Sequence, residues 1–398
     1  MTRCSYCGKD NKDTEECLFC CGCGARIREE PAAPPSPAPK RIPYKPKYLD
    51  LSGLPGAFEV VEGFSRLNWK PVYILLQAKL REHPDATREI VLDLEMQWME
   101  RLRDDLGGGY HVSLCRSFVV LSELPEEVVV RLASHGEEVL HFIAEALLGA
   151  WDYAQERLCI LLFTEPDDYF QYIAYLYPEG VHPQTSGLFV ARDLFHIAAQ
   201  SATGFGLRGL LAHELTHLSL AHLPMPRWLD EGLATHVERR LTGGGTPVMN
   251  RELRERHGAF WTKERAQEFW AGTSFYTPGD SVELSYNLAE ILVNILCVEK
   301  GFKQFVRHAS YVDAGQTAAL DTMKLSLGDA LATFLGPGDW RPRLDKMAQC
   351  KARYSEARTR VPPDSNTIEE PMDEDPGNPD EGSNADRVEN QEPKRQKK

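Results

Sequence analysis

Two histidines four residues apart, with a glutamate between them, are the residues of this sequence best suited to metal chemistry. His213, Glu214 and His217 lie in an apolar run, 207–223, whose leucines recur at the three- and four-residue spacing of a helix with one buried face. Residues four apart lie one turn above each other, so both imidazoles can reach one metal ion. Glu214 lies one position further round, where it can flank a metal-bound water without binding the metal itself.

A third candidate ligand follows a break in this helix. Glu231 stands fourteen positions beyond His217. Pro224 and Pro226 end the first helix, and the stretch from Leu229 onward again has helical spacing. A second helix that returns beside the first would present Glu231 to both histidines. Two neutral histidines and one carboxylate leave a tetrahedral zinc ion with one open position, which is the pattern of catalytic zinc sites.

The two motifs, HELTH at 213–217 and PRWLDEGLA at 226–234, together resemble those of the gluzincin zinc metallopeptidases, above all the compact peptidase MA-like members. The resemblance implies an α+β, zincin-like fold, in which a mixed sheet precedes the active-site helix and a helical half follows. The ligands of the catalytic zinc that it implies are His213, His217 and Glu231. It also implies that Glu214 is the general base of peptide-bond hydrolysis.

Two further positions bear on the resemblance: Tyr286 matches the pattern of these proteins, and Thr235 departs from it. Tyr286 stands where peptidase MA-like proteins commonly carry a tyrosine that faces the metal, near the start of an amphipathic helix expected at 284–299. Its phenol could donate a hydrogen bond to the oxyanion of the reaction, and simple packing at a helix start is the alternative. Thr235 stands where thermolysin-type enzymes carry an aspartate. The carboxylate that would orient a ligating histidine therefore stays unassigned.

The first 23 residues hold six of the ten cysteines. Two CxxCG motifs separated by twelve residues suit one structural zinc ion. Its predicted ligands are Cys4, Cys7, Cys20 and Cys23. Cys17 and Cys20 form a rival CxxC pair, and a disulfide cluster is the alternative to zinc. The segment resembles the small zinc ribbons that open many prokaryotic proteins, and metal binding would stabilise so short a unit.

The predicted organisation has five parts. They are a zinc ribbon at 1–28, a proline-rich linker at 29–47, a helical part of the body at 48–115, the gluzincin-like peptidase domain at 116–350 and a disordered acidic tail at 351–398. Apolar periodicity predicts helices at 71–81, 87–106, 126–150 and 167–176, and strands at 117–121, 158–164, 186–190 and 193–198. By the resemblance, the strand at 187–190 would pair with the substrate backbone.

Composition limits the classes of function. The chain of 398 residues is 42% hydrophobic, enough for a full-sized core. Its net charge of −14 argues against a nucleic-acid or membrane-surface role. With no apparent signal peptide or membrane span, a cytoplasmic protein is expected. The expected partners are a peptide or protein substrate and a protein bound by the ribbon. A zinc-dependent metallopeptidase is the first hypothesis, and a zinc-binding interaction protein with little turnover is the alternative.

Overall fold

The computed structural model describes residues 2–3, 10–11, 44–146, 157–176, 186–191, 194–201, 205–242 and 251–360 of the chain. The strands are β1 Thr2–Arg3, β2 Asp10–Asn11, β3 Phe58–Val61, β4 Phe64–Leu67, β5 His111–Leu114, β6 Phe118–Ser122, β7 Leu158–Phe163, β8 Gly187–Val190 and β9 His196–Gln200. The first helices are α1 Trp69–Glu82, η1 Pro84–Ala86, α2 Thr87–Leu106, α3 Glu126–Ala146, α4 Pro166–Ala174, α5 Phe205–Leu220 and α6 Arg227–Thr242. The later helices are α7 Arg251–Phe260, α8 Lys263–Ala271, η2 Thr273–Tyr276, α9 Asp280–Leu296, α10 Phe302–His308, α11 Gln316–Met323, α12 Leu327–Leu335 and α13 Leu344–Arg360.

The largest sheet has five strands in the order β5-β6-β7-β9-β8. Strands β6, β7 and β9 run parallel to one another, whereas the edge strands β5 and β8 pair antiparallel with their neighbours. Every residue of β7 is buried, which confirms the prediction that this continuous apolar run lies at the centre of a sheet. The mixed α+β class is likewise confirmed.

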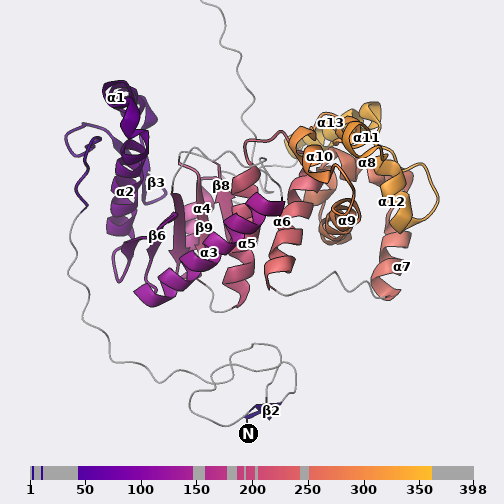
Figure 1. Cartoon of the computed structure of the whole chain (residues 1–398), viewed down its shortest axis with the longest axis horizontal. Helices are drawn as coiled ribbons and strands as arrows, with labels where there is room; N and C mark the ends of the chain where they lie inside the picture. Colours follow the sequence, from indigo (N-terminus) through magenta and orange to yellow (C-terminus); the bar gives the residue numbers. More distant parts are fainter. Residues whose placement is uncertain are drawn as a thin grey trace, which may run out of the picture. The chain divides into compact units, whose positions relative to one another are not determined.

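Helices cover both faces of this sheet (Figure 1). Leu158, Ile160 and Leu162 of β7 belong to a core that includes residues of α3, α5, α6 and α9. Cys159 and Phe163 alternate with them and point into a second core with α2 and α4. This alternation follows from the two-residue period of a strand. The sheet therefore separates two apolar cores, and the helix that bears the HELTH motif belongs to the first.

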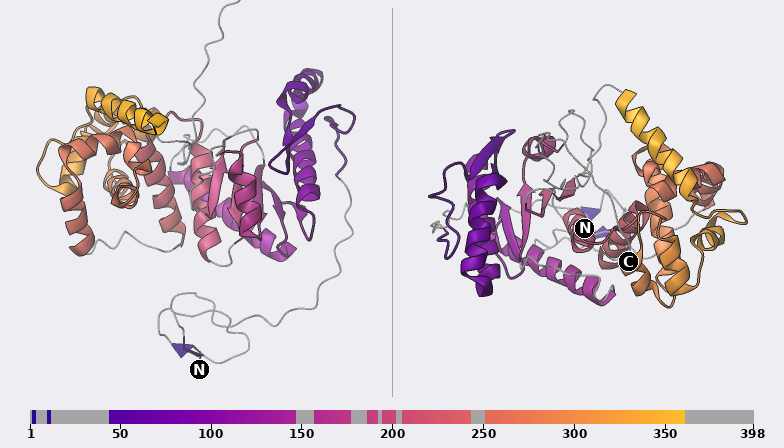
Figure 2. Two further views of the ribbon diagram at one scale, coloured as in Figure 1. Left: turned by 180° about the vertical axis from the view of Figure 1, so that it is seen from behind. Right: turned by 90° about the horizontal axis from the view of Figure 1, so that it is seen from above.

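The second half of the body is helical (Figure 2). Residues 251–276 contain α7, α8 and η2. Helix α9 packs against α6, so the amphipathic helix predicted at 284–299 is present and lies beside the helix that carries Glu231. No helix in the described segments has the length and apolar character needed to cross a membrane.

Two predicted boundaries differ from the structure. Residues 48–115 were expected to form a separate helical part, but they contain strand β5, which pairs with β6. The segments 48–115 and 116–350 therefore both contribute strands to one sheet. The prediction missed β5 because this strand has only four residues, which are half exposed and lack a clear apolar alternation. Helix α13 continues to Arg360, beyond the expected start of the tail at residue 351, because buried Met347 and Cys350 anchor it.

The predicted ribbon falls almost wholly outside the described residues. Strands β1 and β2 pair antiparallel, with Thr2 opposite Asn11 and Arg3 opposite Asp10. The four predicted zinc-binding cysteines lie outside the described residues, as do most of the linker at 29–47 and the tail beyond residue 360. The structural zinc therefore stays a prediction.

A buried carboxylate of α2, Asp93, holds residues 44–49 against that helix. Asp93 accepts hydrogen bonds from the backbone N–H groups of Lys47, Tyr48 and Leu49 at 2.6–3.0 Å, and from the Tyr44 hydroxyl at 2.8 Å. Each buried donor left without a partner costs about 1–3 kcal/mol. We therefore expect Asp93→Ala to lower the free energy of unfolding by about 3–5 kcal/mol in urea denaturation.

The matched control is the exposed carboxylate of Asp50, which accepts one hydrogen bond from the Ser52 N–H at 2.8 Å. Water replaces this bond when it is lost, so Asp50→Ala should change the same free energy by no more than about 0.5 kcal/mol. Equal effects of the two substitutions would show that Asp93 does not anchor the segment.

Candidate metal centre

Helix α5 turns both histidines toward α6. Its apolar face, formed by Leu211, Leu215 and Leu218, is buried in the first core. The imidazoles of His213 and His217 are thereby left on a neighbouring face, and α5 packs closely against α6. The helical spacing that was predicted from the leucines therefore sets the direction of the histidines.

A short reversal between the helices brings the third residue to this face. Helix α5 ends at Leu220 and α6 begins at Arg227, after the two prolines. The carbonyl oxygen of Pro226 accepts hydrogen bonds from the N–H groups of Leu229, at 2.9 Å, and Asp230, at 3.2 Å, and so starts the new helix. The predicted pair of helices is confirmed.

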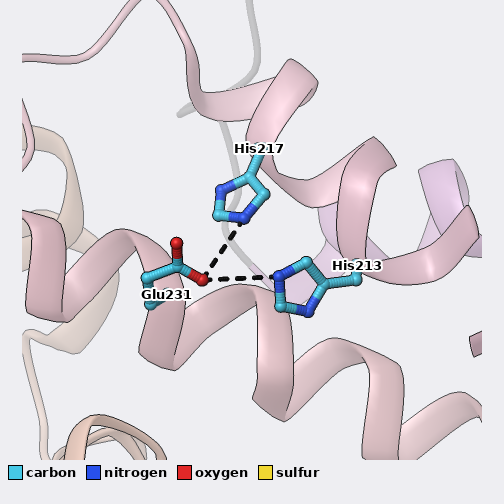
Figure 3. Close-up of side chains that lie close together, drawn as sticks. All are labelled: His213, His217 and Glu231. Carbon is cyan, nitrogen blue, oxygen red and sulfur yellow. Dashed lines mark ion pairs between the residues drawn. The ribbon is translucent and has the colours of Figure 1, made fainter. Parts of the chain in front are cut away.

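His213, His217 and Glu231 meet between α5 and α6 (Figure 3). The Oε2 atom of Glu231 lies 3.4 Å from Nε2 of His213 and 3.5 Å from Nε2 of His217. One ligand atom from each residue lies within 4.8 Å of the others. The predicted triad is thus assembled from two helices, with its carboxylate facing both imidazoles.

These separations suit a shared metal ion. Zinc binds imidazole nitrogen and carboxylate oxygen at about 2.0–2.2 Å, which places neighbouring ligands of a tetrahedral site about 3.3–3.5 Å apart. The Oε2 atom of Glu231 is buried and has no hydrogen-bond partner in the described part of the chain. A buried carboxylate oxygen needs such a partner, and a metal ion would serve. The residues present therefore fit a metal ion with nitrogen and oxygen ligands.

Two carboxylates of α6 hold the histidines from behind. Nδ1 of His217 lies 2.9 Å from Oδ1 of Asp230, and Nδ1 of His213 lies 3.1 Å from Oε2 of Glu238. Donation from each Nδ1–H leaves the Nε2 lone pair available to a metal and fixes the orientation of the ring. Asp230 and Glu238 are therefore the carboxylates that contact the Nδ1 atoms of the two histidines.

The electrostatic field of the site favours positive charge on the imidazoles. Burial lowers the pKa of His213, but the carboxylates of Glu231 and Glu238 outweigh it and raise that pKa to about 9. Burial likewise opposes protonation of His217, and Asp230 and Glu231 raise its pKa well above the usual value. The same carboxylates attract a metal cation, which displaces these protons when it binds.

Arg227 balances part of this negative charge. Its Nη2 atom lies 2.7 Å from Oε1 of Glu231, the carboxylate oxygen that faces away from the histidines. Burial alone would raise the pKa of Glu231, but Arg227 and His217 hold it well below the usual value. Glu231 is therefore an anion in spite of a side chain only 3% exposed.

Glu214 points to the edge of the sheet. Its Oε2 atom accepts a hydrogen bond of 2.7 Å from the backbone N–H of Phe189, in edge strand β8. Glu214 is buried, yet it belongs to neither of the carboxylate pairs that hold the histidines. The predicted base is thus held by β8, and α5 packs against that strand.

Tyr286 reaches the site from α9. Burial and the negative charge of Glu231 raise the pKa of Tyr286 above its usual value, so the phenol keeps its proton. Close packing of α9 on α6 depends on Gly232, because a Cβ atom there would lie 2.7 Å from the carbonyl oxygen of Ala289 and from the Val293 side chain. The glycine after Glu231 therefore lets Tyr286 come near the carboxylate.

Three residues of the site were missed in the sequence: Arg227, Asp230 and Glu238. They stand four residues before, one residue before and seven residues after Glu231. Arg227 and Glu238 lie on the same side of α6 as Glu231, since spacings of four and seven return to the same face of a helix.

No family model and no curated protein matches the chain, so the inference about its function depends on this geometry.

Proposed function

We propose that the chain is a zinc-dependent metallopeptidase of the gluzincin type, with a zincin-like fold. The observation that carries the proposal is the triad itself: one carboxylate oxygen 3.4 and 3.5 Å from two imidazole nitrogens, with Glu214 adjacent on α5. Two histidines and one carboxylate are the ligand set of catalytic zinc, which keeps a fourth position for water or substrate. A purely structural zinc site would use four protein ligands.

Each residue of the site has a separate role in the proposed hydrolysis. A bound zinc ion supplies a Lewis acid and makes water a nucleophile near neutral pH. Glu214 takes a proton from the attacking water and passes it to the leaving amine. Tyr286, which keeps its proton, donates a hydrogen bond to the carbonyl oxygen as negative charge develops there. Asp230 and Glu238 hold the imidazoles throughout.

Strand β8 supports a peptide as the substrate. It is an edge strand, and the backbone N–H of Phe189 points outward to the carboxylate of Glu214, the residue after His213. An extended peptide can add to such an edge and present its backbone carbonyl groups at a fixed spacing. A substrate strand beside β8 would take the place of Glu214 at the Phe189 N–H and leave the Glu214 carboxylate free to act as the base. This arrangement favours peptide bonds over other hydrolysable groups.

Removal and return of zinc tests the proposal directly. We expect the chain to cleave a mixed peptide library, to lose this activity on treatment with a zinc chelator and to regain it with added zinc. Metal analysis should find about two zinc ions per chain, one at the triad and one at the predicted ribbon. A variant that lacks residues 1–30 should hold about one zinc ion and still cleave the library.

Other outcomes would redirect the interpretation. Two zinc ions without any cleavage would favour a zinc-binding interaction protein. Zinc that disappears entirely with residues 1–30 would show that the triad does not bind the metal, and would contradict the proposal.

A further inference from the structure

Arg227 occupies a position that simple charge pairing does not explain. It lies in the first turn of α6, four residues before Glu231, and its Nη2 atom lies 2.7 Å from Oε1 of that residue. Its Nη1 atom lies 4.0 Å from Asp230. Its Cβ atom lies beside Gly272, so the arginine stem is fixed at the end of α8. The guanidinium is therefore directed at one oxygen of the carboxylate.

The two oxygens of Glu231 have different surroundings. Oε1 is held by Arg227, whereas Oε2 faces the two imidazoles and has no hydrogen-bond partner among the described residues. A free carboxylate can bind a metal through one oxygen or through both. Because Oε1 is engaged, only Oε2 is available to a metal at the triad.

A second arginine of this helix that pairs with a buried glutamate is placed differently. Arg239 of α6 lies 2.5 Å from Oε1 and 2.8 Å from Oε2 of Glu290. Its Nη2 atom donates a hydrogen bond to Oε2 and its Nε atom forms an ion pair with Oε1, so both oxygens of Glu290 face one guanidinium. Arg227 leaves one oxygen of its partner free, and that oxygen is the one directed at the histidines.

We infer that Arg227 is a positioning residue that restricts Glu231 to binding the metal through a single oxygen. This inference rests on the proposed function. With His213 and His217, one carboxylate oxygen makes three protein ligands and keeps a fourth position open for water or substrate. Without Arg227, Oε1 would be free to turn toward a bound metal and would then fill part of that position. The arginine thereby sets the coordination number at the triad.

Cobalt substitution tests the inference without reference to activity. Co²⁺ takes the place of zinc, and the intensity of its visible absorption falls when coordination rises from four to five. The full chain and its Arg227→Met variant are compared, each as a difference spectrum against the same protein with His217→Ala. This subtraction removes cobalt held by the N-terminal cysteines. Methionine keeps the Cβ and Cγ atoms beside Gly272 and removes the guanidinium.

We expect Arg227→Met to bind cobalt at the triad within about tenfold of the original affinity, but with weaker absorption per bound ion. Arg227→Lys should restore the original intensity, because an ammonium group can also hold Oε1. Arg251→Met is the matched control: it removes another arginine–glutamate pair four residues apart, at 2.7 Å, on the exposed side of α7. This control should leave the spectrum unchanged.

The failures of the two proposals are distinguishable. If the unaltered chain shows no cobalt difference spectrum against His217→Ala, the metal site itself is wrong, and with it the proposed function. If that spectrum is present and Arg227→Met has the same intensity per bound ion, Arg227 does not restrict Glu231. A lower affinity with an unchanged spectrum would show only a structural role for Arg227, and would equally contradict the inference.

Discussion

Glu214→Gln is expected to lower kcat for peptide cleavage by about 10³–10⁴-fold while the chain keeps its zinc. Glutamine has nearly the size of glutamate, and its carbonyl oxygen can still accept the hydrogen bond from the Phe189 N–H. It cannot accept a proton from water near neutral pH. The metal ligands lie on other residues, so their geometry is untouched. The measurement is kcat on a single peptide substrate, together with zinc per chain.

Two companion variants separate basicity from position. Glu214→Asp keeps the carboxylate but shortens the side chain by one methylene, so it should retract the base from both the water and Phe189 and lose about 10²-fold. Glu255→Gln, at an exposed position of α7, is the control for the loss of one negative charge and should leave kcat unchanged. Substantial activity in Glu214→Gln would exclude Glu214 as the base.

The parts of the fold with strong periodicity could be predicted from the sequence. Helix α2 spans the predicted 87–106, and β7 lies within the predicted 158–164, because each has an apolar pattern long enough to identify it. Strand β9 lies at 196–200 rather than at 193–198. Its register is set by pairing with β7, where His196 lies opposite Cys159, and a local pattern contains no information about that partner.

The candidate site could likewise be predicted only where local sequence patterns, without tertiary packing, position its residues. His213, His217 and Glu231 could be identified because helix geometry alone joins the first two, and the proline break returns the third. Asp230 and Glu238 could not, because charged residues on a helix usually mark its solvated face. Their role depends on which side of α6 meets α5, and this is decided by tertiary packing that includes the contact of Gly232 with α9.

Loss of a triad residue is expected to remove the metal altogether. In His217→Ala or Glu231→Gln, two protein ligands remain, too few for a tetrahedral zinc site, so we expect zinc to fall by about one ion per chain and cleavage to vanish. Glutamine is chosen at position 231 because it keeps the size of the side chain and an oxygen that can accept a hydrogen bond from Arg227. Loss of the buried negative charge can still cost about 3–5 kcal/mol in stability. A thermal unfolding scan therefore accompanies the metal analysis.

A graded series makes this expectation sharper. Asp230→Asn and Glu238→Gln leave all three ligands in place but weaken the groups that orient them, so each should lower zinc affinity by about 10–100-fold in a competition with a chelator. The order of loss then follows the distance from the metal: complete for the ligands and partial for the carboxylates behind them. Zinc retained at full stoichiometry in His217→Ala and Glu231→Gln would mean that the metal lies elsewhere. In that case Asp230 and Glu238 serve only to neutralise two half-buried histidines, whose raised pKa values would then describe a charged cluster between α5 and α6.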